Sequence, residues 1–372
     1  MNRFLMGKIG LWIGGALLLL TALGCDPSNG GDDTGRDLSH IPYEPKDYPL
    51  TTPPGLPGLP PSPGNPQTYD GVQLGRHLFF DPILSLDSTL SCSGCHDPRR
   101  SFTDNLALSP GVGGTLGSRS SMTVLNAAYY TSGLFWDGRS ALLEDQALEP
   151  VVNPVEMHEQ WPNVEEKLRR HTQYPELFRK AFGIRNTSEI TRDLAARAIA
   201  QYERLLLTGG QSIYQQQVRS ERFFDDDQQE GHDLFFNLDP LIPDAECFHC
   251  HSAPLIQANE FFNNGIDSVG DLGDFADKGR GGVNGVFFDN GKFKAPSLYN
   301  IALTAPYMHD GRFKTLEEVI DHYNSGGHAA DNKDGFIRPL GLTPRQKRSL
   351  LSFLHCLTDT SYLQNPDVLS PF

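Results

Sequence analysis

Two copies of the pattern Cys-x-x-Cys-His constrain this chain more than any other feature. Cys92 and Cys95 precede His96 in the first copy, and the second copy is Cys247-Phe-His-Cys250-His251. Two cysteines at this spacing reach the two vinyl groups of a haem, and the adjacent histidine lies under the iron as its ligand. The motifs therefore predict two covalently attached haems c, each with its motif histidine as an axial ligand.

Cysteine pairs can also bind zinc, so a zinc site is the alternative to haem attachment. Pairs that share one zinc ion usually lie about 12–20 residues apart, whereas a long stretch of chain separates Cys95 from Cys247. Haem is the better explanation. Of the other cysteines, Cys25 belongs to an N-terminal leader, and Cys356 has no evident partner. We expect Cys356 to be a buried, unreactive thiol.

The first 24 residues have the pattern of a secretory signal peptide, with Arg3 and Lys8 before an apolar run over 9–23. The run ends in Thr21-Ala22-Leu23-Gly24-Cys25, which resembles a bacterial lipobox. We expect a periplasmic or cell-envelope protein that is lipid-anchored at Cys25 and touches the membrane only there; cleavage without lipid is the alternative. Residues 25–67 are rich in Pro and Gly and are predicted to form a tether.

The acidic composition limits the classes of partner. The formal net charge is −15 and the pI is about 5.2, which excludes nucleic acid as a partner because phosphate binding needs clustered Lys and Arg. An acidic surface can attract a basic redox protein, although the charge is equally explained by solubility alone.

Apolar residues recur three and four positions apart in several segments, so the sequence predicts a mainly α fold with long irregular loops. The expected helices cover 164–181, 191–207, 227–236, 315–323 and 344–357. Gly-rich loops are expected over 109–118 and 263–292.

An internal repeat divides the chain into two c-type cytochrome domains. Gly75-x-x-Leu-Phe-Phe precedes the first motif, and Gly231-x-x-Leu-Phe-Phe precedes the second. Later in each half, Asp-Gly-Arg begins a predicted helix, ending at Arg139 and Arg312, with an asparagine about ten residues earlier. We predict an N-terminal haem domain over 68–225 and a C-terminal haem domain over 226–372.

The repeat predicts that the two haems differ at the sixth coordination position. Eleven residues after the Asp-Gly-Arg arginine stands Pro150 in the first half and Tyr323 in the second. Proline offers no atom to iron, whereas a tyrosine phenolate binds ferric iron. We therefore expect an open haem on His96 and a six-coordinate haem held by His251 and Tyr323. The alternative ligands for the second haem are Met308, His309 and His322.

A site that cleaves peroxide needs a group that takes a proton from one oxygen and returns it to the other, with a polar neighbour. Gln146 and Glu156 follow the first Asp-Gly-Arg element, but on pattern alone they are weak candidates, because a Gln on a helix and a Glu in a loop are usually solvated. Trp136 either carries electrons between the haems or fills the core.

Over residues 68–358 the sequence resembles the bacterial di-haem cytochrome c peroxidases and the related MauG enzymes. The resemblance rests on five segments: Leu74-Gly-Arg-His-Leu-Phe-Phe-Asp-Pro82, Ser91-Cys-Ser-Gly-Cys-His-Asp97, Phe135-Trp-Asp-Gly-Arg139, Asn153-Pro-Val-Glu-Met157 and Pro306-Tyr-Met-His-Asp-Gly311.

This resemblance implies that peroxide reacts at the N-terminal haem, with Gln146 and Glu156 as the distal catalytic residues. It implies that Trp136 relays electrons between the haems. It also implies a calcium ion between the domains, bound by the Asn126 side chain and the backbone carbonyls of Thr304 and Pro306.

Two departures from the peroxidases point to the MauG-like subgroup. Many of the peroxidases carry a histidine in the loop after the first motif, and this sequence has none between His96 and His158. They also place methionine where Tyr323 stands, while MauG has tyrosine there and proline at the position of Pro150. A tyrosinate ligand lowers the potential of the second haem.

The leading hypothesis is therefore a di-haem oxidoreductase that uses hydrogen peroxide. Its electrons come either from a small cytochrome c or cupredoxin, or from aromatic residues of a partner protein. The rival hypothesis is an electron-transfer cytochrome without catalytic activity, with both irons capped; a haem-based sensor is a weaker third.

Overall fold

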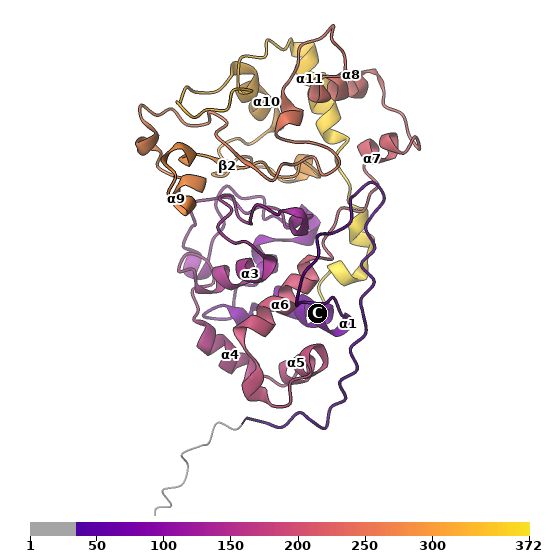
Figure 1. Cartoon of the computed structure of the whole chain (residues 1–372), viewed down its shortest axis with the longest axis vertical. Coiled ribbons are helices and arrows are strands. Elements are labelled where there is room, and N and C mark those ends of the chain that lie inside the picture. The colour runs from indigo at the N-terminus through magenta and orange to yellow at the C-terminus, as the bar shows by residue number, and fades with distance from the viewer. Residues whose placement is uncertain (1–34) are drawn as a thin grey trace, which may run out of the picture. The chain divides into compact units, whose positions relative to one another are not determined.

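The computed structural model describes residues 35–372, and helices are its main regular elements (Figure 1). The expected signal peptide and the lipid site at Cys25 lie outside the described residues. Within the described part, no helix is long and apolar enough to cross a membrane. The predicted mainly α fold class is confirmed. The helices are α1 (Tyr69–Phe80), α2 (Cys92–Cys95), α3 (Leu143–Val152), α4 (Trp161–Arg170), α5 (Tyr174–Phe182), α6 (Arg192–Glu203), α7 (Ile213–Val218), α8 (Asp226–Phe236), α9 (Arg280–Asn284), α10 (Leu316–Ser325) and α11 (Pro344–His355).

The single helix expected over 164–181 is two helices, α4 and α5. Helix α4 ends at Arg170, and α5 begins at Tyr174 with Pro175 in its first turn. Proline lacks a backbone N–H and clashes with the carbonyl four residues earlier, so it is tolerated only where a helix begins. The two Asp-Gly-Arg elements also lie in turns, and α3 and α10 begin four residues after each arginine.

The Gly-rich segment over 263–292 begins and ends beside a short antiparallel pair of strands. Strand β1 (Phe261–Phe262) pairs with β2 (Phe293–Lys294), with Phe261 opposite Lys294. The segment is less irregular than expected, because α9 and two short 3-10 helices form within it.

Two helix crossings explain the repeated Gly-x-x-Leu-Phe-Phe element. Helix α1 packs against α6, and α8 packs against α11. A side chain at Gly75 would collide with the backbone carbonyl of Ala198, and one at Gly231 would collide with that of Ser349. Only glycine permits such close approach of two helix backbones.

The repeated asparagines have matching structural roles. The side-chain oxygen of Asn126 accepts from the backbone N–H of Thr208 at 3.1 Å, and that of Asn300 accepts from Asp359 at 2.6 Å. Both asparagines are fully buried and have a positive φ near 60°. Each therefore fastens the start of its loop to the segment that follows α6 or α11.

Three apolar clusters form the core. The first contains residues of α1 and α3–α6, and the second contains residues of α8, α10 and α11. The third joins α1 and α6 to the C-terminal tail, where Tyr362 packs near Phe102. The tail of the chain therefore contributes to the core around the first motif.

The described part of the Pro/Gly-rich segment lies against the folded helices. Leu38 is buried in the first cluster, and Asn65 donates to the Glu144 carboxylate at 2.7 Å. The hydroxyl of Tyr48 donates to Asp367 near the C-terminus at 2.9 Å. From Gly35 onward this segment packs along the molecule (Figure 1).

Candidate haem sites and active site

The first Cys-x-x-Cys-His motif forms the one-turn helix α2, with His96 at its end. The Nδ1 atom of His96 lies 3.1 Å from the carbonyl oxygen of Phe102. A histidine that donates from Nδ1 to a backbone carbonyl leaves Nε2 free to bind a metal, and this contact fixes the ring orientation. Burial lowers the pKa of His96, so the imidazole is neutral, as a metal ligand must be.

A cavity of about 1000 Å³ adjoins this motif. Cys92, Cys95 and His96 all line it, with apolar side chains such as Phe79 and Ile199. Two thiols, an imidazole and an apolar wall at this scale fit a covalently bound haem. The predicted site residues Trp136, Gln146, Pro150 and Glu156 line the same cavity.

Glu156 is the predicted proton-transfer group of the first cavity. Burial raises the pKa of its carboxyl group. The Asn153 amide donates to Glu156 Oε1 at 2.8 Å, and this bond opposes the shift by stabilising the charged form. A carboxyl group with a raised pKa can both accept and return a proton near neutral pH.

The second motif has a parallel arrangement. The Nδ1 atom of His251 lies 3.0 Å from the carbonyl oxygen of Pro296, and burial lowers the pKa of His251 to about 4. A cavity of about 210 Å³ is lined by Cys247, Cys250 and His251. These donors again match the needs of a haem c, and the other walls are largely apolar.

Three of the four candidate ligands for the second iron line the second cavity: Tyr323, Met308 and His309. The Asn264 amide donates to the Tyr323 hydroxyl at 3.2 Å and also lies 3.4 Å from the Met308 sulfur. Burial raises the pKa of Tyr323 to about 12. His322 does not line this cavity, because its Nε2 lies against the Asn264 carbonyl at 3.0 Å.

Pro150 and Tyr323 occupy equivalent places in the two halves. Each is the eighth residue of its helix, α3 or α10, and each lines the cavity of its own half. Counting eleven residues from each Asp-Gly-Arg arginine therefore reaches the same position in two corresponding helices. The first cavity presents a proline where the second presents a phenol.

Trp136 and Lys294 are among the residues that line both cavities, and they differ in how clearly the sequence marks them. Trp136 was a candidate from its motif, but Lys294 was not. Lys294 is 3% exposed, its ammonium group donates to the Gly133 carbonyl, and it lies 4.1 Å from the centre of the Tyr130 ring. Burial lowers the pKa of Lys294 to about 7. Its only sequence signal is a charge inside the apolar stretch Phe293-Lys-Ala-Pro.

The residues implied for calcium are not all brought to one cavity. Thr304 and Pro306 line the second cavity, whereas Asn126 lines neither. The Asn126 amide is occupied by Thr208, because its nitrogen also donates to Thr208 Oγ1 at 3.3 Å. The calcium site remains a prediction. Cys356 is buried and free, as expected.

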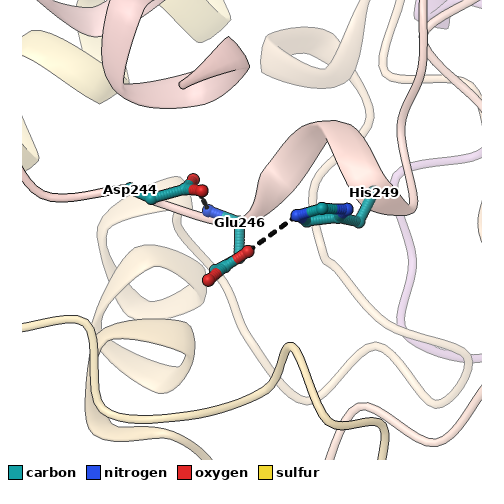
Figure 2. Close-up of side chains that lie close together, drawn as sticks. All are labelled: Asp244, Glu246 and His249. Atoms are coloured by element: carbon teal, nitrogen blue, oxygen red, sulfur yellow. Dashed lines mark hydrogen bonds and ion pairs between the residues drawn. The ribbon is translucent and has the colours of Figure 1, made fainter. Parts of the chain in front are cut away.

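An ionic cluster beside the second motif was not foreseen (Figure 2). His249 Nε2 lies 2.8 Å from Glu246, and Glu246 also pairs with Arg338. Asp244 accepts the backbone N–H of Glu246 at 2.6 Å. Phe336 stacks on the His249 ring at 3.6 Å. These contacts fasten the segment around Arg338 to the second motif.

Comparison with known proteins agrees with this arrangement. The family model described as di-haem cytochrome c peroxidase matches residues 69–222. The methylamine utilization protein MauG of Methylorubrum extorquens is 34% identical over 293 residues, which is 79% of each chain. The cytochrome c551 peroxidase of Pseudomonas aeruginosa is 33% identical over 297 residues, covering 79% of this chain and 80% of that protein.

A solved structure is similar along most of the chain. The crystal structure of a MauG-like protein associated with microbial copper homeostasis has a TM-score of 0.80 and 32% identity, and the match covers 87% of this chain and 99% of that one. Such identity over such coverage, in proteins named as peroxidases and MauG, extends to function as well as fold. This protein is an oxidoreductase of the di-haem cytochrome c peroxidase and MauG family.

Proposed function

We propose that hydrogen peroxide reacts in the first cavity, where Cys92, Cys95 and His96 would hold a haem, and that Tyr323 would bind the iron of the second haem. The observation that carries this proposal is the contrast between Pro150 and Tyr323 at equivalent positions of α3 and α10. Proline has no atom that could bind iron, so a haem in the first cavity would leave room for a small oxidant, whereas Tyr323 would offer a phenol oxygen to the iron of the second haem.

The residues of the first cavity supply the proton transfers. A haem held by Cys92, Cys95 and His96 would supply the redox chemistry that cleaves the O–O bond of peroxide. Glu156 takes a proton from one peroxide oxygen and delivers it to the other, which leaves as water. Gln146 orients the oxidant, because its amide can both donate and accept a hydrogen bond.

Two electrons per peroxide must reach the first cavity from elsewhere. We propose that they pass through Trp136, which lines both cavities. The source is a redox partner at the second haem: either a small cytochrome c or cupredoxin, or the oxidisable aromatic residues of a partner protein. The tyrosine ligand favours the second source, because it stabilises oxidised iron and makes the haem a poor acceptor from ordinary donors.

The chain is proposed to act in the periplasm or cell envelope as two haem domains, 68–225 and 226–372, behind a signal peptide. A non-catalytic electron-transfer protein is disfavoured by the family and by the polar groups of the first cavity, Gln146 and Glu156.

The test is an anaerobic titration of the diferric protein with one equivalent of peroxide, followed optically and by electron paramagnetic resonance. We expect one high-spin and one low-spin haem at the start, and a long-lived oxidised state spread over both haems afterwards. Two low-spin haems that do not respond to peroxide would contradict the proposal and leave only electron transfer.

A further inference from the structure

A buried carboxyl group in the first cavity has no part in the chemistry above. Glu203 is the last residue of α6, is 4% exposed, and lines the cavity that contains His96 and Glu156. Its Oε2 atom is buried and has no hydrogen-bond partner among the described residues. Buried polar atoms in folded proteins are nearly always paired, so an unpaired carboxyl beside a cofactor cavity needs an explanation.

The charged groups around Glu203 do not neutralise it. Glu144 on α3 repels a negative charge at Glu203, and Cys92 on α2 and Tyr202 on α6 are the other titratable groups that face it. Burial, reinforced by Glu144, raises the pKa of Glu203 to about 8. The carboxyl group is therefore protonated at neutral pH, and a small change of nearby charge decides whether it ionises.

Two arginines on neighbouring parts of the chain, Arg204 and Arg76, bind other partners. Arg204, the next residue along the chain, donates to the carbonyl of Pro60 at 2.5 Å. Arg76 on α1 donates to the carbonyl of Leu369 at 2.6 Å. Neither arginine forms an ion pair with Glu203 within the described residues.

The internal repeat indicates that the fold does not require a carboxyl group here. In the first half, Gly75 packs on Ala198 and Tyr202; in the second, Gly231 packs on Ser349 and Phe353. Tyr202 therefore corresponds to Phe353, and Glu203 corresponds to Leu354. Leu354 lines the second cavity as Glu203 lines the first. Because Leu354 fills this position in the second half, packing alone does not require a carboxyl group there. The carboxyl group of Glu203 is therefore specific to the first haem site.

We propose that Glu203 is a redox-linked proton site of the first haem: it binds a proton when that iron is reduced and releases it when the iron is oxidised. One electron from an external reductant converts ferric to ferrous iron, and one proton from solvent converts the Glu203 carboxylate to the acid. The physical basis is repulsion, since reduction removes a positive charge from the cavity and makes a nearby carboxylate less favourable. By reciprocity, protonation of Glu203 raises the reduction potential of the haem.

The experiment is a potentiometric titration of the haem-loaded protein at a series of pH values across the pKa of Glu203, without peroxide. We expect the potential of the first haem to fall by up to about 59 mV per pH unit above neutrality, because each unit is a tenfold change in proton concentration for a one-electron couple. The second haem, with Leu354 in the equivalent place, is measured in the same titration as an internal control.

Three variants assign the effect. In Glu203→Gln the slope is expected to disappear, and in Glu203→Leu, which copies the second half, it should disappear as well. Glu144→Gln should keep the slope, but the pH range in which the potential depends on pH should shift to lower pH. The reason is that removing the negative charge of Glu144 lowers the pKa of Glu203. Infrared difference spectra of reduced minus oxidised protein should contain a protonated-carboxyl band that Glu203→Gln lacks.

The controls make the result decisive. A native slope in both Glu203 variants overturns the proposal, as does a native potential that does not depend on pH. Glu156→Gln should keep the slope, and its loss there would assign the proton to Glu156 instead. Since no peroxide is used, failure of this proposal is distinguishable from failure of the proposed peroxide chemistry.

Discussion

Trp136 donates its indole N–H to the backbone carbonyl of Ser120 over 2.9 Å, and both residues line both cavities. Ser120 in turn holds the second half of the chain, because its backbone N–H donates to the carbonyl of His309 at 2.7 Å. The indole is thus fixed in the wall that the two cavities share. This position suits an electron relay, and it makes the role of Trp136 testable.

Trp136→Phe should uncouple the two haems. We expect peroxide to react at the first haem while the second haem changes much more slowly, because the aromatic group between them is harder to oxidise. Stopped-flow spectra after one equivalent of peroxide measure both haems. Trp161→Phe is the matched control, since Trp161 is buried in the first apolar cluster and lines neither cavity. Equal behaviour of the two variants would contradict the relay.

Tyr323→Phe should remove the axial oxygen of the second haem. We expect loss of the low-spin ferric signal in electron paramagnetic resonance, because phenylalanine has no atom that binds iron. His322→Ala should keep the signal, since His322 lies outside the cavity. An unchanged signal in Tyr323→Phe together with a changed one in Met308→Leu would assign the ligand to Met308.

Glu156→Gln should lower the rate of reaction with peroxide by about 10²-fold, which is the usual contribution of a positioned proton-transfer group. The native rate should fall as pH decreases through the pKa of Glu156, because only the carboxylate accepts a proton. The pH profile of the rate constant with peroxide checks both statements. A native rate in this variant would exclude the role.

Asn153→Leu should shift the acid limb of the pH–rate profile, which is the pH range in which the rate falls as Glu156 is protonated. Arg139 and the hydrogen bond from Asn153 both lower the pKa of Glu156, so loss of that bond leaves only Arg139 to oppose burial and raises the pKa. The limb is therefore expected at higher pH than in the native protein. A limb that stays in place, or that moves to lower pH, would show that another group controls the reaction.

Arg119→Ala should destabilise the protein by about 3 kcal/mol, because it leaves the buried Asp137 and the half-buried Asp277 without their partner. Arg119 pairs with Asp137 at 2.6 Å and with Asp277 at 2.7 Å, and so joins the two halves of the chain. Denaturant unfolding of the haem-loaded protein measures the change. Lys180→Ala, which breaks an exposed pair with Glu176, should cost less than about 1 kcal/mol. Similar losses in both variants would contradict a linking role for Arg119.

Short patterns predicted much of the site because they describe local geometry. The Cys-x-x-Cys-His motifs place two thiols and an imidazole within one helical turn, and the structure forms α2 and a 3-10 helix there. Each Asp-Gly-Arg element is followed directly by the helix that contains Pro150 or Tyr323. The positions of these two residues could therefore be predicted by counting along the sequence. Peroxidase and MauG family membership followed from such motifs and is confirmed by the comparisons.

The chain alone thus determined the helical class, the repeat, the two cofactor motifs and the unlike residues Pro150 and Tyr323 at equivalent positions of two helices. Tertiary structure decided which distant residues meet: that Glu203 and Lys294 line the cavities, that Arg119 reaches Asp277, and that Asn126 is held by Thr208. The physical reason is that these contacts depend on how helices such as α1 and α6 cross. A crossing is set by packing between segments far apart in sequence, which periodicity within one segment does not encode.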